Sequence, residues 1–289
     1  MKVKLISVPY DAGRFMAGLG LGPLAILEAG LAAKLTAAGH DVTETTLLLG
    51  ESRPREISTG FAMAADVARA CREAALAEQF PLVIAGNCLT ALGICAGTGA
   101  DAALWFDAHG DLNTPDTTTS GLLDGMALSA LMGRCWPGLT GSIEGFAALP
   151  PQRVVIVDGR DLDPPEAAVI AQEQIRHIAV AEASAAATDL AGDGARHIYL
   201  HLDLDVHDPA QALANQFGVS GGPSPEEVRQ AVTRIATAAP LAGAAMTAYD
   251  PSFDPSGRTA AAAVDLAAAL INAVAERRAS EALNSAVRL

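Results

Sequence analysis

Short apolar runs alternate with longer segments of helical spacing along almost the whole chain. The length of these runs, their apolar composition and the turn residues beside them are typical of buried strands. We predict strands at residues 3–8, 41–48, 82–85, 102–106, 154–157, 198–202 and 243–248, with a weaker one near 177–180. The segments between them have helical spacing and predict helices at 23–38, 59–78, 125–132, 164–174, 225–238 and 258–278.

The order of these elements predicts the fold class. Strands that alternate with helices are usually joined by crossover connections, which give a mainly parallel sheet with helices on both faces. We therefore expect an α/β protein that forms one domain over residues 1–289. A closed eight-stranded barrel is the competing architecture, because the number of predicted strands is similar.

The helix predicted at 225–238 has a well-marked start. Ser224 can act as the N-cap, and Pro225 suits the first helical position. Glu227 completes a capping box three residues after Ser224, which satisfies backbone donors at the helix start. These three residues place the helix start more sharply than the apolar spacing does.

Two acidic clusters directly follow two of the predicted strands. They are Asp107-Ala108-His109-Gly110-Asp111, after residues 102–106, and Asp203-Leu204-Asp205-Val206-His207-Asp208, after residues 198–202. Residues two apart on an extended strand share a face, so their side chains can bind the same ion or pair of ions. Carboxylates that are brought together repel one another and cannot be buried unpaired. The clusters therefore predict bound divalent cations.

Polar side chains also follow other predicted strands, at the edge where open α/β sheets place their ligands. They are Asn87, Cys88, Asp158, Asp161, Asp163 and Asp250. Because these groups come from separate strands and are mostly anionic, they predict one site assembled from distant segments. The alternative is that the carboxylates cap helices or form surface turns, which is the usual role of an isolated aspartate.

The types of side chain in the clusters indicate which metal they would bind. Oxygen ligands with one imidazole favour manganese or magnesium-like ions, with iron or cobalt as alternatives. Two ions about 3.5–4 Å apart would lower the pKa of a shared water and hold a hydroxide near neutral pH. The clusters therefore predict metal-dependent hydrolytic chemistry.

The overall composition narrows the class of partner. The formal net charge is −14, aromatic residues make up 4% of the chain and no basic residues cluster, so we expect no nucleic-acid partner. No uninterrupted apolar stretch reaches about 18 residues, so we expect no transmembrane helix. The amino terminus lacks the pattern of a secretion signal. The four cysteines show no disulfide-framework spacing, which predicts a reducing compartment and hence the cytoplasm.

Several segments resemble the signature segments of the ureohydrolase superfamily, which includes the arginases and agmatinases. They are Ala85-Gly86-Asn87-Cys88, residues 105–115, Thr117-Thr118-Thr119-Ser120-Gly121 and Leu202-Asp203-Leu204-Asp205. The resemblance covers nearly the whole chain. It implies a three-layer α/β/α sandwich around a mainly parallel eight-stranded sheet, with two manganese ions that split an amidino C–N bond of a small molecule. It also suggests a homo-oligomer, either a trimer or a hexamer.

The resemblance implies roles for individual residues. The implied metal ligands are Asp107, His109, Asp111, Asp203 and Asp205. Asp111 would also orient the attacking hydroxide. The residues that match contacts to the α-carboxylate of an amino-acid substrate are Asn113, Thr118 and Ser120. Asp163 matches a contact to the substrate's α-amino group, and Glu166 lies in the same segment. The alternative for Asp163 and Glu166 is that both are acids at the start of a helix near Pro164.

Three positions depart from the family pattern. Cys88 stands where a histidine ligand is usual. As a thiolate it would bind metal and favour softer ions, whereas as a buried thiol it would leave one ion short of a ligand. Asp124 replaces a histidine that relays protons in arginases, so it would either relay a proton or bind a cationic substrate group. Ala248 stands where arginases present a glutamate to the guanidinium.

Together these departures argue against plain arginine as the substrate. A substituted or hydroxylated guanidine, a formimino group or another amide-like carbon is compatible with the remaining site. We therefore expect a binuclear metal-dependent hydrolase of a linear amidine or guanidino-type C–N bond. The alternative is a non-catalytic relative that keeps metal ions as a sensing or binding module.

The remaining histidines and cysteines have no partner motif. His207 lies beside the second cluster and is expected to cap a turn. The histidines expected to be structural are His40, His177, His197 and His201. The cysteines expected to be small buried hydrophobic residues are Cys71, Cys95 and Cys135.

Overall fold

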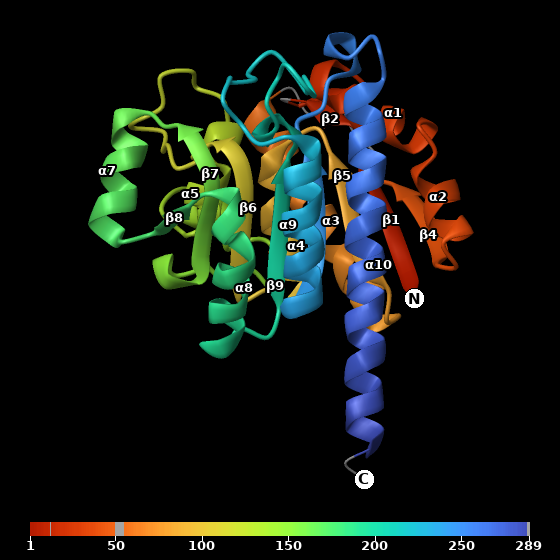
Figure 1. Ribbon diagram of the computed structural model, residues 1–289. Coiled ribbons are helices and arrows are strands. Elements are labelled where there is room, and N and C mark those ends of the chain that lie inside the picture. Colours follow the sequence, from red (N-terminus) through yellow and green to blue (C-terminus); the bar gives the residue numbers. More distant parts are fainter. Residues whose placement is uncertain (12, 50–54, 288–289) are drawn as a thin grey trace.

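The structure, a computed structural model, describes residues 1–11, 13–49 and 55–287, with side chains up to residue 284. Its centre is an eight-stranded sheet whose paired strands all run parallel (Figure 1). In spatial order the strands are β4 (Asp41–Thr46), β1 (Lys2–Val8), β5 (Phe80–Ala85), β10 (Leu241–Thr247), β9 (Ile198–Asp203), β6 (Ala102–His109), β7 (Val154–Asp161) and β8 (Arg176–Ile178). Within the described residues the sheet is open, with β4 and β8 at its edges. The predicted parallel sheet is confirmed, and the barrel alternative is wrong.

Helices cover both faces of the sheet and give three layers (Figure 1). One layer contains α1 (Gly22–Glu28), α2 (Leu31–Ala37), α8 (Ala183–Gly192), α9 (Pro225–Ala238) and α10 (Arg258–Val287). The other contains α3 (Glu56–Leu76), α4 (Ala91–Thr98) and α5 (Ala127–Leu131), with α6 (Pro137–Thr140) and α7 (Pro164–Glu173) beside it. Each layer buries its own apolar core against the sheet, which confirms the α/β/α arrangement.

Alternation along two central strands decides which side chains face the α3–α4 layer. In β9, Tyr199 packs in the core beneath that layer, and His201 and Asp203 follow it at intervals of two. In β6, Trp105 packs in the same core, and Asp107 follows it two residues later. Because side chains two apart on a strand share a face, both aspartates point to the α3–α4 side of the sheet.

Most predicted elements are present, with changes at their ends. The helix predicted at 23–38 is two helices, α1 and α2, because Gly30 between them has a φ of 97°, a left-handed value that favours glycine. The strands predicted at 102–106 and 154–157 continue to His109 and Asp161. The helix α4 was not predicted, because its residues are apolar on nearly all sides and show no helical period. A short antiparallel pair, β2 (Tyr10–Asp11) and β3 (Arg14–Phe15), lies outside the main sheet.

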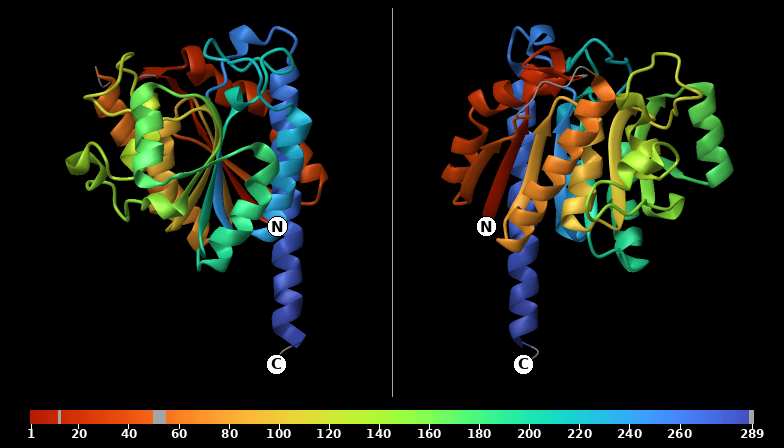
Figure 2. Two further views of the ribbon diagram at one scale, coloured as in Figure 1. Left: turned by 60° about the vertical axis from the view of Figure 1, so that its left-hand side comes forward. Right: turned by 180° about the vertical axis from the view of Figure 1, so that it is seen from behind.

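Two helical stretches are long and apolar enough to cross a membrane by length and composition alone, Gly18–Ala37 and Arg258–Asn284. Both contribute side chains to the core on one face of the sheet, including Leu31 and Leu270, and the first is interrupted at Gly30. The Arg258–Asn284 stretch is 61% buried and the Gly18–Ala37 stretch 39% buried in the structure. The carboxyl-terminal part of α10 extends beyond the rest of the molecule (Figure 2).

Candidate metal centre

A cavity of about 470 Å³ lies at the carboxyl ends of the central strands. Residues at or just after the ends of five strands line it: Cys88, Asp107, Asp161, Asp203 and Ala248. The parallel order of the sheet produces this convergence, because the carboxyl ends of neighbouring parallel strands meet at one edge. The site is thus assembled from segments that are far apart in the sequence.

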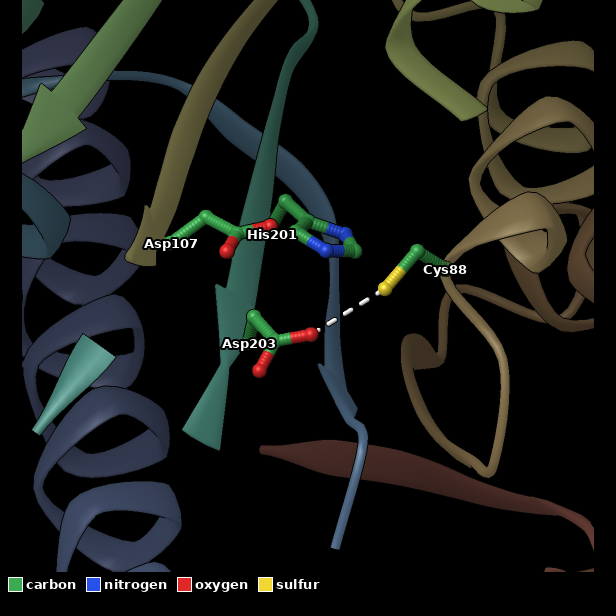
Figure 3. Close-up of side chains that lie close together, drawn as sticks. All are labelled: Cys88, Asp107, His201 and Asp203. Carbon is green, nitrogen blue, oxygen red and sulfur yellow. Dashed lines mark hydrogen bonds between the residues drawn. The ribbon is translucent and has the colours of Figure 1, made fainter. Parts of the chain in front are cut away.

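The first group of possible metal ligands lies at the buried base of the site. Cys88, Asp107, His201 and Asp203 each offer one ligand atom, and these atoms all lie within 4.8 Å of one another (Figure 3). The Cys88 thiol donates a hydrogen bond from Sγ to Oδ2 of Asp203, 3.1 Å away. Burial and the neighbouring carboxylates, Asp203 first among them, raise the pKa of this thiol well above its ordinary value. A cation at this position would favour the thiolate instead.

The second group consists of Asp107, His109 and Asp205, whose ligand atoms also lie within 4.8 Å of one another. Nδ1 of His109 is 3.3 Å from Oδ1 of Asp107 and 3.5 Å from Oδ2 of Asp205. Burial disfavours the imidazolium, but the hydrogen bonds to the two carboxylates outweigh it and raise the pKa of His109 to about 12. Asp107 belongs to both groups, so its carboxylate is placed to bridge two ions.

The charges of the site fit bound cations. Burial raises the pKa of Asp107 to about 6, and burial together with Asp205 raises the pKa of Asp203 well above its ordinary value. These carboxylates therefore resist ionising side by side, since each negative charge disfavours the next. Divalent ions would remove that repulsion and satisfy the buried oxygens together.

Asp111 provides independent support for a cation at the site. Its side chain is buried, it lines the cavity, and its Oδ2 has no hydrogen-bond partner among the described residues. Its φ of 50° lies in the left-handed region, which non-glycine residues seldom adopt. Asp111 belongs to neither group of ligand atoms, so its predicted roles as a ligand and as the residue that orients hydroxide stay predictions.

Asp124 lines the cavity and is hydrogen-bonded to the loop after β5. Nδ2 of Asn87 donates a hydrogen bond to Oδ2 of Asp124, and the backbone N–H of Leu89 lies 3.5 Å from its Oδ1. Burial raises the pKa of Asp124 to about 7, and these hydrogen bonds only partly offset it. An acid with that pKa can both hold and release a proton near neutral pH.

The residues predicted to bind an amino-acid substrate are only partly gathered. Asn113, Ser120 and Asp163 line the cavity, and Nδ2 of Asn113 donates to Oδ2 of Asp163 at 2.9 Å. Thr118 lies on an exposed loop, where its hydroxyl accepts a hydrogen bond from the backbone N–H of Gly121. Thr118 is not among the described residues that line the cavity.

Glu166 has a structural role. It is buried, and its carboxylate accepts hydrogen bonds from the backbone N–H groups of Leu112 at 2.8 Å and Asp163 at 2.9 Å. Asp163 and Glu166 form a capping box at the start of α7. The helix-start alternative is thus confirmed for both acids. The contact between Asp163 and Asn113 leaves Asp163 at the cavity wall, and a substrate contact by either acid stays a prediction.

Ala248 lies at the cavity wall after β10, with a φ of 61°. Its carbonyl oxygen accepts a hydrogen bond from Nδ2 of Asn215 at 2.7 Å, and the same Nδ2 lies 3.3 Å from Oδ2 of Asp205. Asn215, which the sequence did not single out, thus links the Ala248 position to the second group of ligands. An alanine there presents no carboxylate to a guanidinium.

Sequence reasoning also missed His201, which was expected to be structural. His201 is fully buried, and burial lowers its pKa to about 3, so its imidazole is neutral. The signal that could have found it is the spacing His201-Leu202-Asp203, which repeats the two-residue spacing of the acidic clusters. Nδ1 of His207, by contrast, donates a hydrogen bond to the carbonyl oxygen of Leu204, 2.9 Å away, as expected for a residue that caps a turn.

The fold and the site define a class. A parallel α/β sheet whose strand ends gather carboxylates, an imidazole and a thiol around a cavity is typical of metal-dependent hydrolases. Comparison with known proteins agrees with this class. The sequence profile described as "Arginase family" matches residues 1–272. The chain belongs to the arginase family.

Individual relatives show how far the similarity extends. The arginase of Bacillus caldovelox is 30% identical over 294 residues, which cover 93% of this chain and 97% of the relative. An N(omega)-hydroxy-L-arginine amidinohydrolase of Streptomyces lavendulae is 33% identical over 243 residues, covering 79% of this chain and 85% of the relative. The crystal structure of the arginase from Bacillus cereus superposes with a TM-score of 0.84 at 29% identity, covering 93% of this chain and 98% of that one.

Proposed function

We propose that the protein is a binuclear manganese-dependent hydrolase that cleaves a C–N bond in a substituted guanidine, foremost a hydroxylated one. The observation that carries the proposal is Asp107, which belongs to two groups of ligand atoms at the base of one cavity. A pair of ions is an arrangement that metal-dependent hydrolases use, because the ions generate a hydroxide near neutral pH and stabilise the charge that develops during attack. Manganese suits the second group, whose donors are two carboxylates and an imidazole.

The chemistry follows from where the acids lie. When bound, a pair of ions would supply hydroxide near neutral pH and stabilise negative charge on the reacting centre. Asp111 would accept a hydrogen bond from the attacking water and orient its oxygen toward the amidino carbon. A C–O bond then forms, the C–N bond to the alkyl nitrogen breaks, and that nitrogen takes up a proton. Asp124, with a pKa of about 7, is placed to deliver this proton.

The charge of the cavity supports a cationic substrate. Beyond the two groups of ligand atoms its lining includes eight acids: Asp11, Glu56, Asp111, Asp124, Asp161, Asp163, Glu166 and Asp250. A guanidinium or an α-ammonium group would be attracted to such a surface. Arg14 also lines the cavity and forms an ion pair with Asp11 at 2.7 Å, which offers a contact for a carboxylate.

Two differences at the site favour a hydroxylated guanidine over arginine. Ala248 removes the carboxylate that would bind an unmodified guanidinium, and Cys88 changes the donor set of one ion. The similarity to the Streptomyces lavendulae amidinohydrolase supports the same substrate class. The products would be a hydroxylated urea and an amine.

The test is a substrate panel assayed with purified protein and manganese. The panel contains arginine, an N-hydroxylated arginine, agmatine and a formimino amino acid, with urea, hydroxyurea and ammonia as readouts. We expect turnover of the hydroxylated guanidine with a kcat/KM at least tenfold above that for arginine. Faster turnover of arginine would overturn the substrate assignment. No turnover by a metal-loaded protein would favour the non-catalytic binding module.

The Asp205→Ala variant controls for the metal. Because Asp205 belongs to the second group, this variant should lose bound metal and turnover together. Asp250→Ala is the matched control for metal content alone, since Asp250 lines the cavity outside both groups and this variant should keep its metal. Full metal occupancy in Asp205→Ala, measured by elemental analysis, would contradict the binuclear assignment.

We further propose that the whole chain forms one metallohydrolase domain that acts in the cytoplasm as a trimer or hexamer. All four cysteines are free and buried, which suits a reducing compartment. Light scattering of the purified protein would test the assembly.

A further inference from the structure

We propose that His201 is a metal ligand, so that the ion beside Cys88 is held by a thiolate, an imidazole and two carboxylates. The proposal rests on the proposed metal centre and specifies the donors of one of its two ions. Cys88 stands where the family resemblance implies an imidazole ligand, and His201 brings an imidazole to the same position from β9. Figure 3 shows both side chains beside Asp203.

The distances within the group suit a single ion. Ligand–metal bonds of about 2.0–2.3 Å place the donors of one ion no more than about 4–4.6 Å apart. The ligand atoms of Cys88, Asp107, His201 and Asp203 already lie within 4.8 Å of one another. Shifts of a few tenths of an ångström would therefore bring all four into contact with one ion.

The hydrogen bonds of His201 show which nitrogen faces the ion. Nδ1 is 2.7 Å from the hydroxyl of Tyr199, deeper in the core. Nε2 is 3.3 Å from Oγ1 of Thr247, and that oxygen lies 3.4 Å from Sγ of Cys88 and 3.3 Å from Oδ2 of Asp203. Nε2 thus faces the other donors. A proton on Nδ1, donated to Tyr199, leaves the lone pair of Nε2 for a metal.

The packing around His201 fixes the ring in this orientation. Its imidazole stacks on the indole of Trp105, with ring centroids 3.6 Å apart and an angle of 9° between the planes. With Tyr199 on one nitrogen and Trp105 on its face, the ring has little freedom to turn away. A ligating histidine usually has such a partner on its second nitrogen, and losing that partner costs about 10–100-fold in metal affinity.

A purely structural role for His201 makes a different prediction. In that case Nε2 would only donate to Thr247, and the sulfur-bound ion would have no imidazole ligand unless His109 supplied one. Removing the imidazole of His109 therefore separates the two roles. His109 is suited to this change because its side chain is 29% exposed, so its replacement disturbs the core little.

The experiment uses X-ray absorption of the full-length protein loaded with cobalt. In the His109→Asn variant we expect a sulfur scatterer together with an imidazole scatterer on cobalt. In the double variant that adds His201→Gln to His109→Asn we expect the imidazole scatterer to be lost and the sulfur scatterer to remain. Tyr199→Phe should weaken cobalt binding about 10–100-fold. The matched control is His207→Gln, because His207 is buried near the site but bonded to a backbone carbonyl, and it should leave the spectrum unchanged.

A cobalt spectrum of His109→Asn that shows a sulfur scatterer but no imidazole scatterer would overturn the assignment of His201 as a ligand. The same result would leave the proposed hydrolysis intact, because turnover is measured separately on the substrate panel. Imidazole without sulfur would also overturn the assignment, since the ion would not lie beside Cys88. If the double variant fails to fold, the His109→Asn spectrum still decides the question.

Discussion

Sγ of Cys88 lies 3.1 Å from Oδ2 of Asp203, and the thiol donates a hydrogen bond to that carboxylate. The Cys88 thiol and the Asp203 carboxylate thus share one proton. In the proposed metal centre both side chains would be anionic ligands. A divalent ion between them would replace that proton, since thiolates and carboxylates bind metal in their deprotonated forms. This hydrogen bond therefore satisfies the buried thiol and carboxylate in the metal-free protein, and it marks the position that an ion would occupy.

The first prediction concerns Cys88 as a ligand. Cobalt bound to the wild-type protein should show a sulfur-to-cobalt charge-transfer band, and Cys88→Ser should lose it. The affinity for the cobalt ion beside residue 88 should fall at least tenfold in this variant, because the soft sulfur donor is replaced by a hydroxyl. Cys95→Ser is the matched control: Cys95 is as deeply buried as Cys88 but lies on α4 outside both ligand groups. A band that survives in Cys88→Ser would exclude the thiolate from the centre.

The second prediction concerns protons released on metal binding. In the metal-free protein the pKa of His109 is raised to about 12 and that of Asp107 to about 6. A bound ion needs both groups deprotonated, so protons compete with metal and affinity should fall as the pH is lowered. His109 should release its proton across the neutral range, and Asp107 should add to the release as the pH falls toward 6.

Calorimetry in buffers of different ionisation enthalpy measures this release. We expect His109→Asn to release about one proton fewer than the wild type at neutral pH. An unchanged proton count in that variant would show that His109 is already neutral in the metal-free protein. Because the count is independent of the binding constant, weaker binding by the variant does not affect the comparison.

The sequence predicted the parts of the fold that depend on local pattern. The helix α9 begins at Pro225, where Ser224 and Glu227 form the predicted capping box. The acids of the two clusters meet because β6 and β9 are paired neighbours in a parallel sheet. Helix capping and strand alternation depend on residues that are close together in the sequence, so they can be recognised without knowing the tertiary structure.

The sequence failed where tertiary packing decides the role of a residue. His201 lies inside an apolar run, so it looked like a core residue, and only the approach of Cys88 from the loop after β5 reveals it as a possible ligand. The partner of Asp124 is Asn87, 37 residues away, and no local pattern links them. The hydroxyl of Thr118 accepts a hydrogen bond within its own loop, and its contact with substrate stays a prediction.

The third prediction concerns Asp124. Asp124→Asn keeps the size of the side chain and can still accept the hydrogen bond from Asn87, but it cannot deliver a proton. If Asp124 protonates the leaving nitrogen, kcat should fall about 100-fold while KM changes little. Steady-state kinetics with the best substrate of the panel measures both constants. A rise in KM at unchanged kcat would instead assign Asp124 to binding a cationic group of the substrate.

The fourth prediction concerns Ala248 and substrate choice. Ala248→Glu would place a carboxylate at the cavity wall next to the second ligand group, and the φ of 61° at this position costs glutamate no more than alanine. A charge-assisted hydrogen bond contributes about 1.5–3 kcal/mol, so kcat/KM for arginine relative to the hydroxylated guanidine should rise at least tenfold. Ala248→Gln, with the same length and no charge, should leave this ratio near that of the wild type. If both variants raise the ratio equally, side-chain size sets the preference and the missing charge does not.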